Sequence, residues 1–162
     1  MTKAYIGIGS NVGDPVQQVR DVMPQLNRIR DTRLLASSSL YRTEPVSDIE
    51  QEDFINAVAC VQTKLTPMDL LLELQAIEHA HYRQRDNGQK WGPRTMDLDI
   101  LLFDNLRQND SHLVIPHPQM QHRLFVLEPL KEIAGDLFIP TLGSLGYMIE
   151  QAPPMRIERV QY

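Results

Sequence analysis

The run of residues from 97 to 103 constrains the fold more than any other part of this chain. Two acids, Asp97 and Asp99, precede a stretch that is apolar at every position, Ile100 to Phe103. Such a stretch predicts a central strand that is buried on both faces. Residues two apart on a strand point to the same face, about 6.6 Å apart along the chain. The two carboxylates are therefore expected side by side at the mouth of a buried strand, where they repel each other unless a cation lies between them.

A basic segment lies immediately before the acids and indicates what such a cation would bind. Arg83, Arg85, Lys90 and Arg94 fall within twelve positions. Magnesium takes oxygen ligands and commonly keeps waters or substrate phosphates among them, and guanidinium groups bind phosphate oxygens in a fixed fork. The segment therefore predicts a metal–phosphate site, in which two ions could clamp the attacking and leaving oxygens. The alternative is a solvated charged loop beside two surface acids.

Hydrophobic periodicity and turn residues predict the order strand, helix, strand, strand, helix, strand. The expected strands are 4–9, 33–41, 54–63 and 96–103. One helix is expected from the N-cap pair Asp14-Pro15 to about residue 29, and the other from the capping box at Thr66 to about residue 82. The remaining segments are loops at 9–14, 42–53, 83–93 and 117–121, a short helix at 126–134, and a small hairpin or helix at 140–151.

This order of elements is the split βαβ pattern of ferredoxin-like domains. It predicts an α+β fold with a βαββαβ core, whose antiparallel sheet is flanked by helices in an α/β/α arrangement and followed by C-terminal additions. The chain has 162 residues and is most simply one domain, 1–162.

Charge, hydropathy and cysteine content exclude several classes of protein. The net charge of −5 argues against a general nucleic-acid binder, which would carry a basic face. No apolar run approaches the roughly 20 residues of a membrane span, and the chain begins with a strand rather than a signal peptide. The single cysteine, Cys60, lies in an apolar run, which indicates a buried, inert thiol and a reducing, cytoplasmic location.

An aromatic residue is paired with an amide at the start of the third strand. Phe54 and Asn56 are two apart and so share a face, and Phe125 follows Arg123 further along the chain. Aromatic and amide side chains together can stack on a flat heterocycle and hydrogen-bond its edge, although ordinary core packing is the other interpretation of both phenylalanines. The glycine-rich segment 9–13 lacks the lysine of a P-loop and is interpreted as a tight turn.

Taken together, these motifs resemble the 6-hydroxymethyl-7,8-dihydropterin pyrophosphokinases of folate biosynthesis. The most specific match is Gly92-Pro93-Arg94-Thr95-Met96-Asp97-Leu98-Asp99-Ile100-Leu101-Leu102-Phe103. Further matching stretches are 5–11, 38–43, 54–57, 75–78 with Arg83 and Arg85, 116–118 and 123–130. That family transfers the terminal pyrophosphate of ATP to the hydroxymethyl group of a reduced pterin and releases AMP. The resemblance therefore implies an ATP-dependent pyrophosphokinase.

The resemblance also implies roles for individual residues. Asp97 and Asp99 would hold two Mg²⁺ ions that bridge the ATP phosphates, and Arg83 and Arg94 would act with them as catalytic residues. The residues implied for pterin binding are Phe54 and Phe125 as the aromatic sandwich, Asn56 at the pterin edge, and the neighbourhood of Thr43, Glu44 and Val46. The residues implied for ATP binding are Glu78, Arg85, Trp91, Arg94, Ile100, His112, His117 and Arg123. The chain departs from common family residues at Lys90, His112, Val114 and Pro118, which lie near the implied nucleotide contacts.

The two long loops, 42–53 and 83–93, are expected to close over both substrates and exclude water. The expected partners are the two small-molecule substrates, with no nucleic acid and no membrane. A monomer is expected, with a pathway contact to dihydropteroate synthase. Two alternatives stay open: a nucleotidyltransferase, which would leave AMP on its acceptor, and a non-catalytic ferredoxin-like module that binds RNA or regulates another protein.

Overall fold

The computed structural model describes residues 1–44, 52–84 and 96–160, and it combines helices with an antiparallel sheet. The strands of the main sheet are β1 (Thr2–Ser10), β2 (Thr32–Ser37), β3 (Tyr41–Thr43), β4 (Phe54–Thr63), β5 (Asp97–Phe103) and β10 (Ile157–Arg159). The helices are α1 (Pro15–Asn27), α2 (Pro67–Gln84), α3 (Leu124–Ala134) and α4 (Leu145–Gln151), with a 3₁₀ turn η1 (Met120–His122) before α3. Two small ribbons pair β6 (Gln108–Asn109) with β7 (Val114–Ile115), and β8 (Phe138–Ile139) with β9 (Gly143–Ser144).

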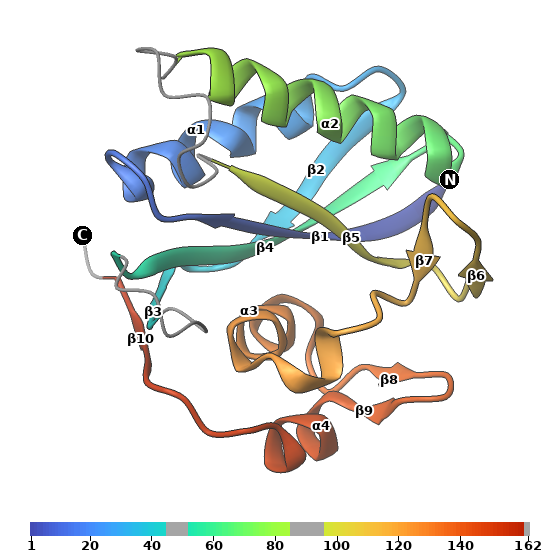
Figure 1. The fold of residues 1–162 in the computed structure, drawn as a ribbon. Coiled ribbons are helices and arrows are strands. Elements are labelled where there is room, and N and C mark those ends of the chain that lie inside the picture. The colour runs from blue at the N-terminus through green and yellow to red at the C-terminus, as the bar shows by residue number, and fades with distance from the viewer. Residues whose placement is uncertain (45–51, 85–95, 161–162) are drawn as a thin grey trace.

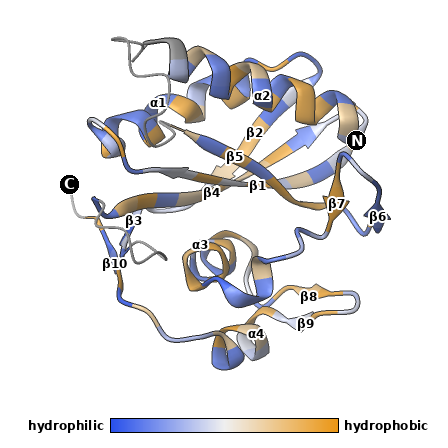
Figure 2. Cartoon of the chain, in the orientation of Figure 1, coloured by the Kyte–Doolittle hydropathy of each residue, from blue (hydrophilic) through white to orange (hydrophobic). Residues whose placement is uncertain are grey.

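The main sheet has the strand order β10-β3-β4-β1-β5, and β2 also pairs with β4. Helices α1 and α2 cover one face of the sheet, and α3 and α4 lie on the other (Figure 1). Figure 2 shows polar and apolar residues alternating around α1 and α2, as expected of helices that pack one side on a sheet. Each face has its own core: Ile6, Ile55 and Leu74 are fully buried on the first, and Leu127 and Leu130 on the second. The predicted combination of an antiparallel sheet and flanking helices is confirmed.

Side-chain caps fix the starts of both long helices. The Asp14 carboxylate accepts a hydrogen bond from the backbone N–H of Gln17 at 3.2 Å, and Pro15 occupies the first helical position of α1. The Thr66 hydroxyl accepts from the backbone N–H of Asp69 at 3.1 Å, which caps α2 as predicted. Helix α1 contains Pro24 and continues to Asn27, two residues short of the expected end.

The predicted single strand 33–41 is wrong, because the chain forms two strands, β2 and β3, separated at residues 38–40. Ser38 causes the break: its backbone N–H donates to the Val58 carbonyl at 2.8 Å, and its hydroxyl accepts from the Val58 N–H at 2.9 Å. Ser39 then turns toward α3 and donates from both its N–H and its hydroxyl to the Glu132 carboxylate. Side-chain hydrogen bonds thus replace regular pairing at this point.

Other boundaries differ by a few residues from the expectation. Strand β1 extends to Ser10, one residue beyond the expected strand 4–9, and β3 takes the first residues of the expected loop 42–53. Helix α2 runs to Gln84, so the expected loop 83–93 begins inside the last turn of a helix. The segment expected as a hairpin or a helix at 140–151 contains β9 and α4, and β9 pairs with β8.

No helix in the described ranges is long and apolar enough to cross a bilayer. Cys60 is buried, as expected, and burial raises the pKa of its thiol.

His81 joins the two helices on the first face and makes stability depend on pH. Its ring is 2% exposed, with Nδ1 2.7 Å from Oε1 of Gln18 and Nε2 3.0 Å from Oε1 of Gln25. Burial lowers the pKa of His81 below its ordinary value of 6.5, although the charge of Asp21 opposes the shift. The unfolded chain therefore binds more protons than the folded chain just below pH 6.5, and we expect stability to be lost as the pH falls through this region.

Denaturant unfolding at pH 7.5 and pH 5.5 checks this expectation. The loss of stability between the two pH values should be smaller in His81→Gln than in the wild type. His79→Gln, an exposed position on the same helix, is the matched control and should keep the wild-type loss. Equal losses in all three proteins would contradict the assignment.

Candidate active site

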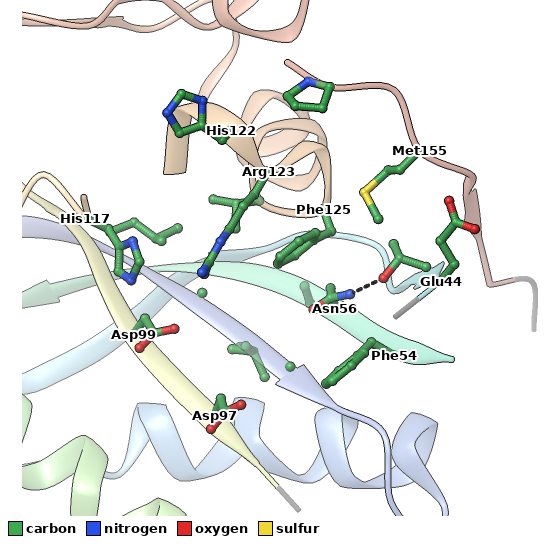
Figure 3. A pocket seen from close by; sticks show the side chains of 18 of the residues that line it. Glu44, Phe54, Asn56, Asp97, Asp99, His117, His122, Arg123, Phe125 and Met155 are labelled. Carbon is green, nitrogen blue, oxygen red and sulfur yellow. Dashed lines mark hydrogen bonds between the residues drawn. The ribbon is translucent and has the colours of Figure 1, made fainter. Parts of the chain in front are cut away.

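A cleft of about 480 Å³ lies on the face of the sheet that carries α3 (Figure 3). Strands β1, β3, β4 and β5, the start of α3 and the segment that precedes β10 all contribute to its lining. The sequence-predicted residues that line it are Thr43, Glu44, Phe54, Asn56, Asp97, Asp99, His117, Arg123 and Phe125. Residues from widely separated parts of the sequence therefore meet in one cavity.

The acid pair lies at the start of β5 and faces this cleft. Asp97 is half-buried and Asp99 is exposed, while the intervening Leu98 is buried against the opposite core. Strand β5 runs antiparallel to β1, so that Asp97 lies opposite Gly9 and Asp99 lies opposite Gly7. Because glycine has no side chain, the space beside both carboxylates stays open. The sequence predicts that both acids point to the same face of the strand, and this burial pattern agrees with that prediction.

The chemistry of this pair fits a hard divalent cation that keeps other oxygen ligands. Among the described residues, no group of three or more histidine, cysteine, aspartate or glutamate side chains could hold a metal ion. Two carboxylates on an open cleft are the protein contribution typical of a Mg²⁺ ion, whose remaining positions go to water and phosphate.

His117 reaches the cleft beside Asp99 from the loop before η1 (Figure 3). Its backbone N–H donates to the Leu101 carbonyl at 3.0 Å, and its ring Nδ1 accepts from the Gln119 N–H at 3.2 Å. Burial lowers the pKa of His117; Arg123 lowers it further and Asp99 opposes the shift. A neutral ring with Nδ1 as acceptor carries its proton on Nε2, which makes His117 a hydrogen-bond donor.

Arg123 brings positive charge to the same cleft. It is the N-cap residue of α3, and its guanidinium carbon lies 5.7 Å from the centroid of the Phe125 ring. Among the described residues that line the cleft, it is the only arginine or lysine. The first turn of α3 also lines the cleft and adds the partial positive charge of a helix N-terminus. Both features favour an anionic group between α3 and the acid pair.

The other half of the cleft is aromatic. Phe54 enters from β4 and Phe125 from α3, and Asn56 lies between them on the cleft wall (Figure 3). Asn56 is 5% exposed, and its Nδ2 donates to the Thr43 hydroxyl at 2.8 Å, which fixes the plane of the amide. Two aromatic faces with one oriented amide suit a flat ring whose edge carries polar atoms.

Three of the residues expected to bind ATP lie away from this cleft. Glu78 of α2 is on the opposite side of the sheet and accepts from the Leu98 N–H at 2.8 Å. Ile100 is buried in the core against α1 and α2. His112 is exposed between β6 and β7, where its N–H donates to the Asp110 carboxylate at 2.8 Å.

The remaining expected site residues lie outside the described part of the chain. Val46, Arg85, Trp91 and Arg94 fall within 45–51 and 85–95, as does the departure at Lys90. Arg83 belongs to the last turn of α2, but its side chain is not among those described.

Several cleft residues have no counterpart among the sequence predictions. Gly7 and Gly9 could have been recognised, because they alternate on a strand and so share a face. His122 and the segment 153–155 gave no comparable indication. The latter reaches the cleft only because β10 pairs with β3, whose residues are more than a hundred positions away.

Gly9 is restricted by Asn56, which lies opposite it in the β1–β4 pair. A Cβ at Gly9 would lie 2.9 Å from the Asn56 amide oxygen, whereas one at Gly7 would meet the flexible end of Leu101 at 3.2 Å. We expect Gly9→Ala to displace the Asn56 amide. Binding of a flat ring in the aromatic half of the cleft should then weaken by roughly tenfold or more, which is the effect of losing about one buried hydrogen bond between that ring and Asn56. Gly7→Ala is the matched control and should cause a smaller loss, measured as the ligand dissociation constant.

Known proteins of one family are similar to this chain over most of its length. The sequence model of one family, 7,8-dihydro-6-hydroxymethylpterin-pyrophosphokinase, matches residues 5–135. The 2-amino-4-hydroxy-6-hydroxymethyldihydropteridine pyrophosphokinase of Haemophilus influenzae is 41% identical over 151 residues, covering 93% of each chain. The protein of the same name from Pseudomonas aeruginosa is 42% identical over 158 residues, covering 98% of this chain and 96% of its own.

A solved structure shares the fold at low sequence identity. The crystal structure of Plasmodium falciparum HPPK-DHPS superimposes with a TM-score of 0.70 and 14% identity. The match covers 93% of this chain and 43% of that chain, so this chain spans less than half the length of that protein. This likeness supports the mixed helix and sheet architecture.

Proposed function

Because the chain belongs to the 7,8-dihydro-6-hydroxymethylpterin-pyrophosphokinase family, we propose that the cleft between the sheet and α3 holds its two substrates side by side. The protein is an ATP-dependent pyrophosphokinase of folate biosynthesis, which transfers pyrophosphate from ATP to the hydroxymethyl group of 6-hydroxymethyl-7,8-dihydropterin. The observation that carries the site assignment is that one cavity joins an acid pair to an aromatic slot with an oriented amide.

The aromatic half of the cleft is the proposed pterin site. The pterin ring stacks between Phe54 and Phe125, and stacking of this kind contributes about 1–3 kcal/mol per ring. Asn56 hydrogen-bonds the polar edge of the ring, and the backbone near Thr43 and Glu44 adds further partners. The fixed amide orientation supports this role, because a preorganised donor and acceptor discriminate strongly against rings that lack the matching groups.

The acidic half is the proposed site for the ATP phosphates. Asp97 and Asp99 would hold Mg²⁺, and we infer two ions from the family resemblance. Bound there, Mg²⁺ would neutralise phosphate charge beside the reacting group. The open space opposite Gly7 and Gly9 supports this assignment, because phosphate oxygens and waters need room next to the carboxylates.

The transfer is proposed as an in-line displacement. The pterin hydroxyl oxygen forms a bond to the β-phosphorus of ATP and gives up its proton to a phosphate oxygen. The bond from that phosphorus to the oxygen of the α-phosphate breaks, and AMP leaves. Arg123 stabilises the charge on the transferring group, and His117 donates a hydrogen bond from Nε2 to a phosphate oxygen. Catalysis of this kind depends mainly on positioning and charge stabilisation.

We infer the ferredoxin-like class from the order β5-β1-β4-β2, in which the first and third strands of the motif are adjacent. We also propose one domain, a monomer and a cytoplasmic location, the last from the single buried cysteine. Contact with dihydropteroate synthase is proposed because the Plasmodium falciparum structure carries HPPK and DHPS in one chain.

The loops 42–53 and 83–93 are proposed to close over both substrates, with Arg83 and Arg94 acting on the transferring group. Most of these residues lie outside the described ranges. The proposal therefore rests on the resemblance and on the need to exclude water, which would otherwise hydrolyse ATP.

A product analysis tests the function as a whole. The protein is incubated with Mg²⁺, ATP and 6-hydroxymethyl-7,8-dihydropterin, and the expected products are AMP and the pterin diphosphate. Free pyrophosphate with AMP attached to the pterin would indicate a nucleotidyltransferase instead. Binding of both ligands without any AMP would indicate a non-catalytic module.

A further inference from the structure

The chain after α4 returns to the cleft and lines one side of it. Pro153, Pro154 and Met155 belong to the lining. Met155 is half-buried, whereas its neighbours Pro154 and Arg156 are exposed, so its side chain is turned inward. Figure 3 shows the thioether pointing toward the part of the cleft that holds Phe125 and Asn56. The two acids lie at the opposite end of that view.

Several contacts hold this segment in place. The backbone N–H of Arg156 donates to the Glu44 carboxylate at 3.1 Å, and its guanidinium lies 3.7 Å from the Asp53 carboxylate. Beyond it, β10 pairs with β3, and the Val160 N–H donates to the Leu40 carbonyl at 2.8 Å. Met155 therefore sits next to an anchored residue rather than on a free tail.

Further along β10, a second anchor connects the segment to α3. Arg159 lies 3.6 Å from the Glu132 carboxylate, and its guanidinium carbon is 5.7 Å from the centroid of the Tyr41 ring. Tyr41 in turn donates from its hydroxyl to Glu132 at 2.5 Å. The same carboxylate also binds Ser39. Glu132 thus joins α3, β3 and β10.

Strand β10 and the residue before it also contact residues proposed to bind the pterin edge. Ile157 is the partner of Thr43 across the β10–β3 pair. The Thr43 hydroxyl accepts the hydrogen bond that orients the Asn56 amide, and Glu44 accepts from the Arg156 N–H. Asn56 and the segment that carries Met155 are therefore connected through Thr43 and Glu44, and both line the same cleft.

We propose that Met155 is a pterin-binding residue that sets ring specificity, forming a third apolar wall beside Phe54 and Phe125. This inference rests on the proposed function of the cleft. A methionine side chain is flexible and polarisable, so it can follow the edge of a flat heterocycle and make a favourable sulfur–aromatic contact. It also limits the size of substituents that fit at that edge of the ring, because Pro153 and Pro154 restrict the backbone behind it.

Equilibrium binding of 6-hydroxymethyl-7,8-dihydropterin to the full chain tests the proposal, and steady-state kinetics give the KM values for the pterin and for ATP. Met155→Ala should raise the pterin Kd and KM about fivefold to tenfold, which is the loss of one sulfur–aromatic contact. The KM for ATP and the thermal unfolding midpoint should stay at their wild-type values. Met155→Leu, which restores an apolar side chain of similar size, should recover most of the affinity.

Two further variants separate a binding role from a structural one. Glu158→Ala alters an exposed residue of β10 and should leave the pterin Kd unchanged. Met155→Gln keeps the length of the side chain but replaces the thioether by an amide, so it should also raise the pterin Kd. It provides the test of binding if Met155→Ala fails to fold.

The outcomes distinguish this inference from the proposed function. If the wild type forms AMP and Met155→Ala and Met155→Gln keep the wild-type pterin Kd, Met155 has no part in binding. An equal rise in the KM for ATP, together with a lower unfolding midpoint, would assign Met155 a structural role only. If the wild type itself forms no AMP from ATP and the pterin, the proposed function fails first.

Discussion

Asp97→Asn and Asp99→Asn are each expected to lower kcat by more than about 100-fold. Mutation of a residue that only hydrogen-bonds a metal ligand already lowers metal affinity or activity by about 10–100-fold, and loss of the ligand itself should have a larger effect. Asparagine keeps the size of the side chain and removes the charge that binds Mg²⁺. Asp97→Ala should abolish turnover. The measurement is AMP release at saturating pterin over a range of Mg²⁺ concentrations, in which added Mg²⁺ should recover little of the lost rate.

The fold should survive these substitutions. Both acids face the cleft from the start of β5, with Asp97 half-buried and Asp99 exposed, and removing one of two neighbouring like charges relieves repulsion. The thermal unfolding midpoint of Asp99→Asn is therefore expected to stay the same or rise slightly. The pterin Kd should also stay the same, because Phe54, Phe125 and Asn56 are untouched.

Asp104→Asn is the matched control for both variants. Asp104 follows the same strand, is exposed and has a φ of 51°, a left-handed conformation that asparagine also adopts readily. It should turn over at the wild-type rate. Undiminished turnover in Asp97→Ala would overturn the metal assignment.

Local sequence patterns predicted that the two acids share one face of a strand, because a strand has a fixed period of two residues. Once Ile100 to Phe103 is recognised as a buried strand, Leu98 must face one core and the two acids must face the other side. The same argument placed Phe54 and Asn56 together on β4. The capped starts of α1 and α2 were equally predictable, because a cap depends on neighbours within three residues.

Features that depend on long-range pairing could not be read from the sequence. Met155 reaches the cleft only through the pairing of β10 with β3, and β10 is too short to show a periodic pattern. The break between β2 and β3 arises because Ser38 and Ser39 find partners on β4 and α3. The position of Glu78 is a similar case, since its carboxylate binds the backbone of Leu98 across the α2–β5 contact.

Arg123→Ala is expected to lower kcat by about 100- to 1,000-fold, the usual effect of removing one preorganised group that stabilises charge in the transition state. Its guanidinium lies over Phe125 and opposite the acid pair, so it stands between the two substrate halves. The pterin Kd should change little, because Phe125 keeps its position in the first turn of α3. Arg123→Lys should recover only a small part of the rate, since an ammonium group cannot reproduce the planar fork of guanidinium hydrogen bonds.

A second variant on the same helix tests whether the loss of one positive charge alone explains the effect of Arg123→Ala. Lys131→Ala removes one positive charge from the exposed side of α3, near the helix C-terminus, and should leave kcat unchanged. A loss in Lys131→Ala as large as that in Arg123→Ala would mean that the overall charge of the helix matters rather than a group in the cleft. A rise in the KM for ATP with no change in kcat would instead assign Arg123 to binding of ATP in the ground state, because only interactions that strengthen in the transition state raise kcat.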